Sequence, residues 1–501
     1  MGDCVPDESQ RADVLIIGAG GSGLTAAIEA ASRGAKVHVL EKNHYIGGTT
    51  RLSVGSITAT GTPHQARHGV VDSIQSHADD LALINGRRNA PDNPALRQVL
   101  VEEMPSTFRW LLDLGVEFVG PLPEEPHSQP RMHCVLPTAR AYIDRLQRRA
   151  RALGVRIDCD RKATSLLTSG ERVIGAVAQD SQGRTTRVTA GATILASGDF
   201  SGNAEMVAQH VGQAASCARP INPTNTGDGH RLAESLGARI LNANVALMSI
   251  RFLPPARAPL IQRLPPTRWL AKTMRIAYER LPAAVVRPFL MAFITSALQP
   301  VRAIYEAGAI LVDRQGRRLG DETAGLATIL AGERSAQAWM ICDQRIVERF
   351  SAWPHFVSTA PGAGYAYMQD YRRHRRDLWH SAASIAELAS QLGMPQALAA
   401  TVADFNDSDA QHRAGRLEKP PFVALGPLQA VLVFTDGGLQ IDTCMRVLGS
   451  AAQPIPGLYA VGAVGQGGML LDGHGHHIGW AFTSGRLAGR HAFEFSRTEV
   501  V

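Results

Sequence analysis

A glycine pattern near the N-terminus constrains the fold more than any other part of this 501-residue chain. Gly18, Gly20 and Gly23 form G-x-G-x-x-G directly after the apolar run Val14–Ile17 and at the start of an alanine-rich stretch that suits a helix. The first glycine permits a tight turn, the second lets the backbone approach a pyrophosphate at a helix N-terminus, and the third lets helix and strand pack closely. The pattern predicts a dinucleotide-binding turn.

The residues that follow extend this turn into a βαβ unit. Gly34 ends the predicted helix, and a second buried strand is expected over Val37–Leu40. Glu41 ends that strand, at the spacing of roughly 20 residues at which a carboxylate accepts hydrogen bonds from ribose hydroxyls. The sequence therefore favours nucleotide binding over a purely structural glycine turn.

A second loop of small residues favours FAD over NAD. Gly48, Thr49 and Thr50 come just after the acidic strand, where Rossmann dehydrogenases usually continue into a helix. Such a loop leaves space for the long ribityl and isoalloxazine half of a flavin. Two later apolar strands that end in glycine, at Gly198 and Gly462, fit the same cofactor.

The middle of the chain is less regular. A helical pattern is expected from about Leu96 to Leu153, and short strands are expected over Arg156–Asp158 and Val173–Gln179. The segment Arg251–Arg302 holds nine basic residues and a single acidic one, Glu279, so most of the excess positive charge belongs to one segment that is expected to start a separate module.

Several motifs give the chain a family resemblance. The fingerprint Gly18–Lys42 is followed in order by GGTTRLSVGSITATGT, ILASGDF, NTGDGHRLAESLGA, GAILVDRQGRRLGDE, FTDGGLQID and IPGLYAVGAVG. This series resembles the fumarate reductase/succinate dehydrogenase flavoprotein superfamily, which includes 3-ketosteroid Δ1-dehydrogenases. The resemblance covers nearly the whole chain.

The resemblance implies an α/β fold: a Rossmann-like, split FAD-binding domain of the GR2 type with an inserted α+β capping domain. The expected divisions are 1–243 and 428–501 for the FAD-binding domain and 244–427 for the cap. The implied chemistry is hydride transfer between flavin N5 and a carbon–carbon bond next to an activating carbonyl, with proton transfer from a residue of the enzyme.

The resemblance also assigns residues to the cofactor. No histidine stands at the family's covalent-flavin position, which falls near Thr49, so non-covalent FAD is expected. The residues expected at the cofactor are Gly18, Gly20, Gly23, Glu41, Lys42, Gly48, Thr49, Thr50, Ser53, Gly55, Ser197, Gly198, Asp228, Gly462, His477 and Ile478.

Departures from the family pattern concern the substrate. Leu253-Pro254-Pro255 replaces a His-Pro-Thr stretch, Phe434 begins the segment that is His-Thr-x-Gly-Gly in fumarate reductases, and a region near Leu326 lacks their proton-donating arginine. Asp472 aligns with their C-terminal arginine, and Leu471 with the catalytic tyrosine of the steroid dehydrogenases. Because a dicarboxylate needs cationic, bidentate donors, a largely apolar substrate is predicted instead.

Three histidines lie in the glycine-rich stretch DGHGHHIGW, residues 472–480. A metal site is disfavoured, because the loop brings no cysteine or carboxylate at standard ligand spacing. In the family this loop begins the last helix beside the flavin, and imidazole suits proton exchange near neutral pH. His474 and His476 are therefore candidate acid/base or substrate-binding residues, with plain packing or solvent exposure as the alternative.

Two carboxylates complete the catalytic candidates. Asp472 can hold or relay a proton, although a loop aspartate is often a turn residue. Glu322 matches a family position in the cap that faces the cleft, and an ion pair with Arg317 or Arg318 is its alternative role.

The basic segment also suggests a partner. Residues 260–300 mix arginines with long apolar side chains, and Arg287-Pro288 interrupts the best apolar run, so a membrane span is not expected. A peripheral contact with anionic lipid through 260–300 is a hypothesis, with a solvated helix pair or an oligomer contact as alternatives. Nucleic-acid binding is not expected.

The six cysteines are scattered without a C-x-x-C pair, which favours a reducing, cytoplasmic setting, with contact at the inner face of the membrane as an addition. The sequence predicts an FAD-dependent oxidoreductase that acts on a C–C or C=C bond of an apolar small molecule, with an unidentified electron donor or acceptor. An oxygen-using flavin oxidase or hydroxylase, and a membrane-associated flavoprotein without such chemistry, remain alternatives.

Overall fold

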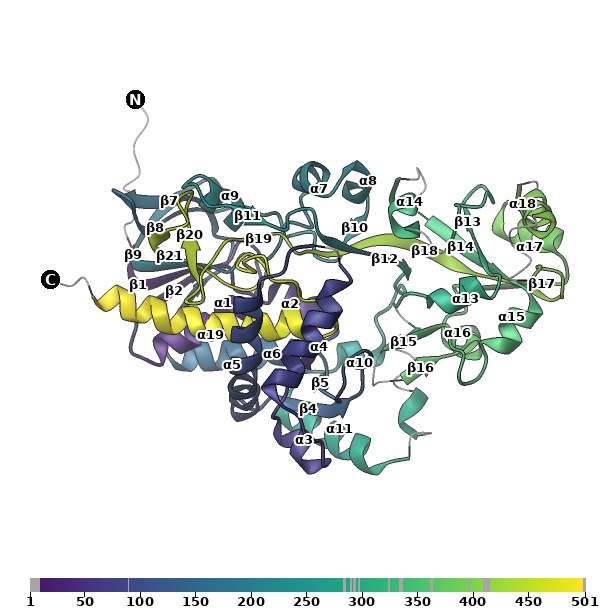
Figure 1. Ribbon diagram of the computed structural model, residues 1–501, viewed down its shortest axis with the longest axis horizontal. Helices are drawn as coiled ribbons and strands as arrows, with labels where there is room; N and C mark the ends of the chain where they lie inside the picture. The colour runs from purple at the N-terminus through teal and green to yellow at the C-terminus, as the bar shows by residue number, and fades with distance from the viewer. Residues whose placement is uncertain are drawn as a thin grey trace.

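A computed structural model describes residues 10–498 except 89, 283–284, 289–290, 292–293, 296–297, 323–324, 333–336, 361–363, 395–396 and 409–414. Figure 1 shows an elongated molecule with one sheet at the end that holds both termini and a second sheet toward the other end. Each sheet has its own cluster of buried apolar side chains. Segments that are far apart in the sequence meet between the two sheets.

The first sheet has eight strands and contains both the beginning and the end of the chain. Its main path runs in the order β20-β21-β9-β1-β2-β6, and β7 and β8 extend from β9. The strands are β1 (Gln10–Ile17), β2 (Val37–Leu40), β6 (Arg156–Asp158), β7 (Lys162–Ser169), β8 (Arg172–Gln179), β9 (Thr185–Leu195), β20 (Arg446–Leu448) and β21 (Pro454–Ala460). β1 pairs in parallel with β2 and β9, and β9 with β21. Every residue of β2 is buried, as expected for a parallel strand covered on both faces.

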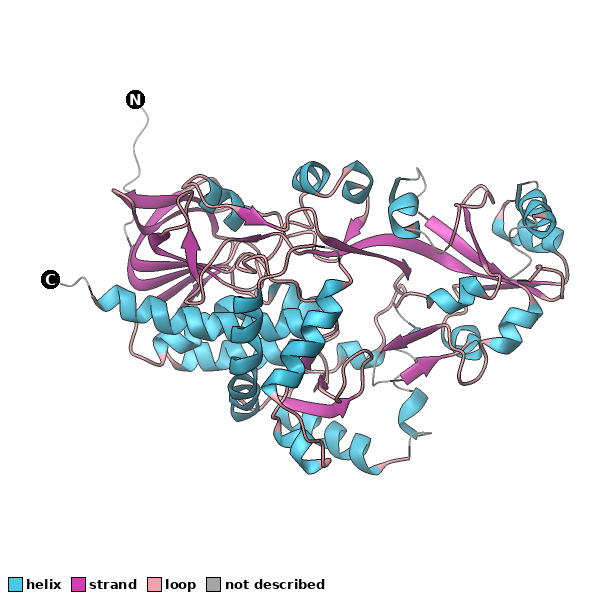
Figure 2. Ribbon diagram, in the orientation of Figure 1, coloured by secondary structure: helices cyan, strands magenta, loops and turns pink. Residues whose placement is uncertain are grey.

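Helices cover this sheet, with the C-terminal helix running along it (Figures 1 and 2). The helices of this part are α1 (Gly21–Ala31), α2 (Gly48–Leu52), α3 (Pro63–Arg67), α4 (Ile74–Gly86), α5 (Pro94–Asp113), α6 (Arg140–Ala152), α9 (Asp228–Glu234) and α19 (His476–Arg497). The short helices α7 (Ala204–His210) and α8 (Gln213–Ser216) pack instead in the second apolar cluster. α1 packs along α19. The packing is close because a Cβ at Gly485 would lie 2.5 Å from the carbonyl oxygen of Ser22, and one at Gly489 would lie 2.5 Å from that of Ala26.

A three-stranded sheet interrupts the stretch that was expected to be helical from Leu96 to Leu153. It consists of β3 (Ser56–Thr58), β4 (Glu117–Leu122) and β5 (Met132–Leu136), in the order β3-β5-β4. The expectation of continuous helix was wrong, because α5 ends at Asp113 and α6 begins only at Arg140. The β4–β5 connection is rich in proline and carries residues that reach the site.

The second sheet forms the cap and has six strands. They are β10 (Arg219–Pro220), β12 (Ala246–Phe252), β13 (Ile310–Asp313), β14 (Gln337–Cys342), β17 (Trp379–Ala382) and β18 (Phe422–Thr435). The long strand β18 pairs with β10, β12, β14 and β17. β18 runs through the expected division at 427/428, and β12 begins two residues after the expected one at 243/244. The two strands join the cap to the first sheet.

The remaining elements surround these sheets. They are β11 (Ile240–Leu241), α10 (Leu260–Arg263), α11 (Arg268–Arg280), α13 (Arg302–Glu306), α14 (Leu326–Gly332), α15 (Gln344–Arg349), β15 (Ser358–Ala360), β16 (Gly364–Ala366), α16 (Met368–His374), α17 (Ile385–Leu392), α18 (Ala397–Asp407) and β19 (Gly438–Leu439). None of the helices in the described ranges combines the length and apolar character that a membrane span requires. The five cysteines in those ranges are free.

The basic segment starts at Arg251 on β12 of the cap sheet, and its continuation packs next to the first sheet's helices. The guanidinium of Arg145 on α6 donates to the carbonyl oxygen of Pro266 at 3.1 Å, and that of Arg275 on α11 donates to Glu117 of β4 at 2.8 Å. Part of the expected lipid-binding stretch, at 283–284, 289–290, 292–293 and 296–297, lies outside the described residues. Residues 260–280 therefore lie against α6 and the β4–β5 hairpin (Figure 1).

Candidate active site

A continuous cavity of about 610 Å³ joins the glycine turn to the C-terminal loop, residues 472–475. All the residues expected at the cofactor line it except Gly23. Of the four catalytic candidates, His474 and Asp472 line it, whereas His476 and Glu322 do not. Its size is within the range of small-molecule sites, about 300–1,000 Å³.

The three glycines of the turn have different surroundings. A Cβ at Gly23 would lie 2.0 Å from the carbonyl oxygen of Gly18, and Gly18 itself has a φ of +111°. A Cβ at Gly20 would meet nothing within 4 Å. Gly18 and Gly23 are therefore required by backbone packing, whereas the open side of Gly20 faces the cavity at the N-terminus of α1.

Acidic and basic side chains surround the cavity beyond the turn. Glu41 is buried, and its carboxylate accepts hydrogen bonds from the backbone N–H groups of Ala19 and Asn43, both at 2.9 Å. The ammonium of Lys42 pairs with Asp228 at 2.7 Å. Burial raises the pKa of Asp228, but the hydrogen bond and positive charge of Lys42 have the larger, opposite effect, so the pKa falls to about 2.

Hydroxyl and glycine positions continue along the cavity wall. Thr49 accepts hydrogen bonds from the side-chain amides of Asn222 and Asn225, each at 2.9 Å. The hydroxyl of Ser197 accepts from the backbone N–H of Gly229 at 3.1 Å, which fixes the first turn of α9 against the end of β9. The lining also includes Gly48, Thr50, Ser53, Gly55, Gly198 and Gly462.

His474 lies at the opposite end of the cavity from the glycine turn, in an ion pair with Glu124. Its Nδ1 contacts the Glu124 carboxylate, which also accepts a hydrogen bond from the His474 backbone N–H at 3.2 Å. Its carbonyl accepts a hydrogen bond from the Thr58 hydroxyl at 2.6 Å. The imidazole is 52% exposed. Desolvation lowers the pKa of His474, but Glu124 raises it more, so the pKa lies above its ordinary value.

His476 is buried and does not line the cavity, contrary to the role expected from the sequence. Its Nδ1 lies 2.8 Å from the carbonyl oxygen of Asp472, and its Nε2 lies 3.2 Å from the Nε2 of His77. Burial lowers the pKa of His476 to about 3. The physical reason is local: α19 begins at His476, and its first side chain packs beneath the loop instead of facing the cavity. The placement of His476 fits plain packing, the alternative role that the sequence left open.

Glu322 likewise lies away from the cavity. Its carboxylate accepts hydrogen bonds from the Arg318 guanidinium at 2.9 and 2.5 Å and from the backbone N–H of Leu311 at 3.0 Å. These contacts hold a turn of the cap beside β13, as in the alternative that the sequence left open.

Asp472 lines the cavity and is paired. Its carboxylate lies 3.2 Å from Arg88 Nε. The carboxylate of a second aspartate, Asp436, lies 3.9 Å from Nη2 of the same arginine. Asp436 accepts a hydrogen bond from Gln466 at 2.8 Å and lies 3.2 Å from His477 Nε2. Asp472 therefore shares the guanidinium of Arg88 with Asp436.

Sequence reasoning missed three side chains at this end of the cavity: Glu124, His127 and Arg251. Glu124 and His127 come from the β4–β5 connection, inside the stretch read as helix. The clustered prolines of PLPEEPHSQP, residues 121–130, were the available signal. For Arg251 the sequence gave no signal beyond its place at the start of the basic segment.

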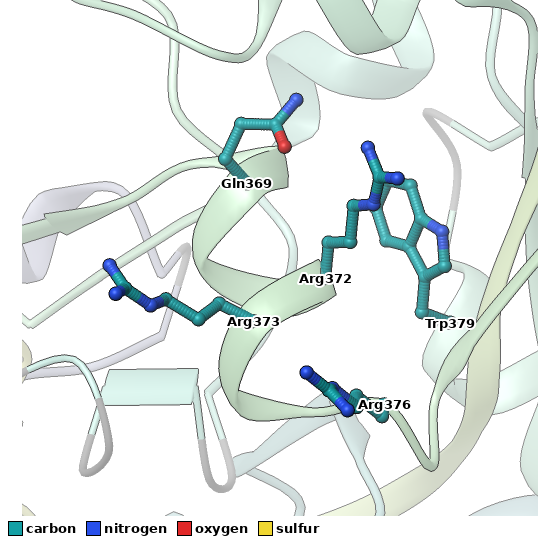
Figure 3. A pocket seen from close by; sticks show the side chains of 5 residues that line it. All are labelled: Gln369, Arg372, Arg373, Arg376 and Trp379. Atoms are coloured by element: carbon teal, nitrogen blue, oxygen red, sulfur yellow. The ribbon is translucent and has the colours of Figure 1, made fainter.

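No group of metal-ligating side chains suited to an ion is present in the described part of the chain. A second concavity, on the cap, is lined by Gln369, Arg372, Arg373, Arg376 and Trp379 (Figure 3). It is more open than the first and contains none of the glycine-turn or C-terminal-loop residues, and its arginines follow α16 to its C-terminal end, where cations are favoured. The site chemistry therefore belongs to the larger cavity.

Comparisons with known proteins show the family and the fold. The model of a family described as "FAD binding domain" matches residues 13–264 and 277–471. The chain is 26% identical to a probable fumarate reductase of Shewanella frigidimarina, over 97% of this chain and 75% of that protein.

Two solved structures share the fold. The open conformation of a flavocytochrome c3 fumarate reductase superimposes with a TM-score of 0.75 at 22% identity, covering 98% of this chain and 79% of that one. A 3-ketosteroid Δ1-dehydrogenase from Sterolibacterium denitrificans gives 0.67 at 17% identity, covering 97% and 100%. The superfamily resemblance and the expected fold class are thereby confirmed.

The lining residues fit FAD. The open face of Gly20 at the start of α1 leaves backbone N–H groups accessible to a pyrophosphate, and Glu41 has the carboxylate that a ribose requires. The N-terminus of α19, capped by Gly475 with a φ of +89°, opens to the same cavity and favours negative charge there.

The contrast between Gly20 and Gly23 yields a prediction. Gly20→Val should fold, because its side chain enters open space, but should purify with much less flavin because it fills the cofactor's place. Gly23→Val should lower the melting temperature strongly, since overpacking against backbone costs about 1–3 kcal/mol or more. Flavin absorbance per protein and thermal unfolding of the flavin-free proteins measure the two effects. Equal flavin content in Gly20→Val and wild type would contradict the placement of the cofactor.

Proposed function

Because the chain belongs to the FAD binding domain family, we propose that this FAD-dependent oxidoreductase forms or reduces a carbon–carbon double bond next to a carbonyl-type group in a largely apolar small molecule. Non-covalent FAD supplies the hydride chemistry when it is bound. The chain's own residues bind and orient the substrate, exclude water and move a proton. The observation that carries the proposal is the continuity of one cavity from the glycine turn to the His474–Glu124 pair.

The character of the far end of the cavity supports an apolar substrate. Aliphatic and aromatic side chains from β12 and β18 of the cap sheet, from the segment before α13 and from the C-terminal loop line it: Leu247, Leu298, Val433, Phe434 and Leu471. The family resemblance predicts Asp472 and a stretch near Leu326 at the positions of the family's fumarate-binding arginine and proton-donating arginine. Asp472 is already paired with Arg88, so it adds an acid rather than a cation to the wall.

His474 is the proposed proton-exchanging residue. It is accessible from the cavity, and its imidazole contacts the Glu124 carboxylate, which orients the ring and stabilises its protonated form. Glu124 in turn is held by the backbone of the loop that it positions. Glu124 therefore acts as a positioning residue, and Asp472 contributes through its pairing with Arg88 rather than by proton transfer.

The proposal predicts which compounds react. Anaerobically reduced holoenzyme should be reoxidised faster by trans-3-nonen-2-one or trans-2-octenoate, which join a double bond and a carbonyl-type group to an apolar chain, than by fumarate. The measurement is the return of flavin absorbance in a stopped-flow instrument. Reoxidation by dioxygen alone, with none of the alkenes, would favour an oxidase or hydroxylase and would sink the proposal.

A second prediction concerns pH. Replacing His474 by Gln should lower the turnover number by about 10²–10⁴-fold, the usual contribution of general acid–base catalysis. In Glu124→Gln the raising influence on the pKa of His474 is lost, so the imidazole loses its proton at lower pH. The midpoint of the pH–rate profile should therefore move to lower pH, whichever direction of reaction is followed.

The exposed His68, changed to Gln, is the matched control and should leave the profile unchanged. An unaltered midpoint in Glu124→Gln, or a full rate in His474→Gln, would remove His474 from the proton path and leave the flavin assignment in place.

We also propose that the basic segment makes a peripheral contact with anionic membranes. Trp269 and Leu260 are 68% and 65% exposed, and they lie among arginines and Lys272 on α10 and α11. Apolar side chains that enter the interface and cations that meet anionic headgroups act together in such contacts. A lipid surface here suits delivery of an apolar substrate.

This contact predicts sedimentation with vesicles that contain phosphatidylglycerol and much less with pure phosphatidylcholine vesicles. Trp269→Ser should weaken the binding severalfold. Trp353→Ser, at a tryptophan that is 65% exposed on the cap, is the matched control and should behave like wild type. Equal binding by both variants, or none by the wild type, would contradict a membrane role for α10 and α11.

A further inference from the structure

Arg251 is a cavity-lining arginine without an acidic partner. It lies on β12, and its Nε donates to the hydroxyl of Ser249 at 3.0 Å. Within the described ranges no carboxylate oxygen lies within 4.0 Å of its guanidinium, whereas the lining cations Lys42, Arg161 and Lys162 each have one. Burial lowers the pKa of Arg251, and no charged group counteracts that effect.

This arrangement is costly unless a ligand completes it. Moving a cation out of water without a countercharge is unfavourable, and such groups in proteins are normally paired. A guanidinium has five N–H donors in a planar fork, and a single hydroxyl contact leaves most of them without a protein acceptor. The other unpaired cation on the lining, Arg87, differs because it is exposed to solvent.

The surroundings indicate what the ligand looks like. Leu247 and Arg251 both come from β12, and both line the cavity. The positive charge of Arg251 is close enough to His474 to oppose the rise in its pKa. Arg251 therefore lies at the His474 end of the cavity, next to the apolar lining, rather than at the glycine turn.

The acids at that end do not neutralise Arg251, because none of them lies within 4.0 Å of its guanidinium: Glu125 is exposed to solvent, and the other two have partners of their own. Glu124 contacts His474, and Asp472 lies 3.2 Å from Arg88. An incoming anion would therefore find one guanidinium without a competing carboxylate. One guanidinium can pair with one anionic group of a ligand, and the apolar wall of the cavity can contact the rest of that ligand.

We propose that Arg251 binds a single carboxylate of an otherwise apolar substrate. This inference rests on the proposed function and deepens it, because it names the chemical class of the molecule in the same cavity. The carboxylate accepts hydrogen bonds from the N–H groups of the guanidinium. The apolar part of the substrate lies along Leu247, Val433 and Phe434. A dicarboxylate such as fumarate would leave its second charge without a desolvated cation, because Arg87, the other unpaired cation on the lining, is exposed to solvent.

The test compares an acid with its neutral isostere. Isothermal titration calorimetry of the oxidised holoenzyme measures the dissociation constants of trans-2-octenoate and trans-2-octenamide. Arg251→Gln should weaken octenoate binding about 10- to 100-fold, the range expected for the loss of hydrogen bonds to a charged group, and should leave octenamide binding unchanged. Arg251→Lys should give an intermediate loss, because it keeps the charge but not the fork.

Arg257→Gln is the matched control, because Arg257 is an exposed arginine just beyond the same strand, and it should bind both compounds like wild type. Flavin content and melting temperature are measured for every variant. Equal weakening of acid and amide, a loss of flavin in Arg251→Gln, or no octenoate binding by the wild type would each overturn the inference.

The outcome is separable from that of the proposed function. Octenoate binding that depends on Arg251, in a protein whose flavin no alkene reoxidises, would support the anion site and contradict the double-bond chemistry. Reoxidation by octenoate with equal dissociation constants in wild type and Arg251→Gln would do the reverse.

Discussion

The close backbone contact between α1 and α19 is the constraint on which the site depends. Gly485 and Gly489 lie one turn apart on α19 and leave no room for a side chain against Ser22 and Ala26 of α1. Packing at this density fixes both the distance and the register of the two helices. Both helices begin at the cavity, one after the glycine turn and one after the C-terminal loop. The contact thus joins the two ends of the chain into one site.

The C-terminal loop is fixed with equal precision on its other side. A Cβ at Gly475 would lie 2.6 Å from the backbone nitrogen of Thr58, and the Thr58 hydroxyl donates to the carbonyl of His474. The backbone of His474 and Gly475 is therefore held against β3. The hairpin that pairs with β3 brings Glu124 to the same point, so one small sheet positions both members of the ion pair.

The sequence was most informative where function depends on local backbone geometry. The turn Gly18–Gly23, the strand that ends at Glu41 and the glycine-ended strands at Gly198 and Gly462 could all be predicted, because each requires a residue type at a fixed offset. The β4–β5 hairpin could not be read from periodicity, since its strands are short and flanked by long helices. Its prolines were the better signal.

The side chains of the far cavity end were harder to predict for a different reason. Glu124, Arg251 and Asp472 come from three separate segments and meet only through tertiary folding. Among the histidines, the start of α19 decides the outcome: His474 precedes the helix and faces the cavity, whereas His476 is its first residue and turns beneath the loop. A difference of two positions separates the two roles, and no pattern in the sequence fixes where that helix begins.

The pairing of charges, rather than their number, determines the electrostatics of the far cavity end. The family resemblance predicts Asp472 at the position of a clamp arginine, and an acid there by itself would make the wall repel an anion. Arg88 and His474 instead neutralise Asp472 and Glu124, and the guanidinium of Arg251 keeps only a neutral hydroxyl partner. Because interactions between unscreened charges are strongest in a buried, apolar setting, this one guanidinium outweighs two carboxylates that are already compensated. In the proposed mode of binding, a substrate's negative charge therefore lies at β12 rather than at the C-terminal loop.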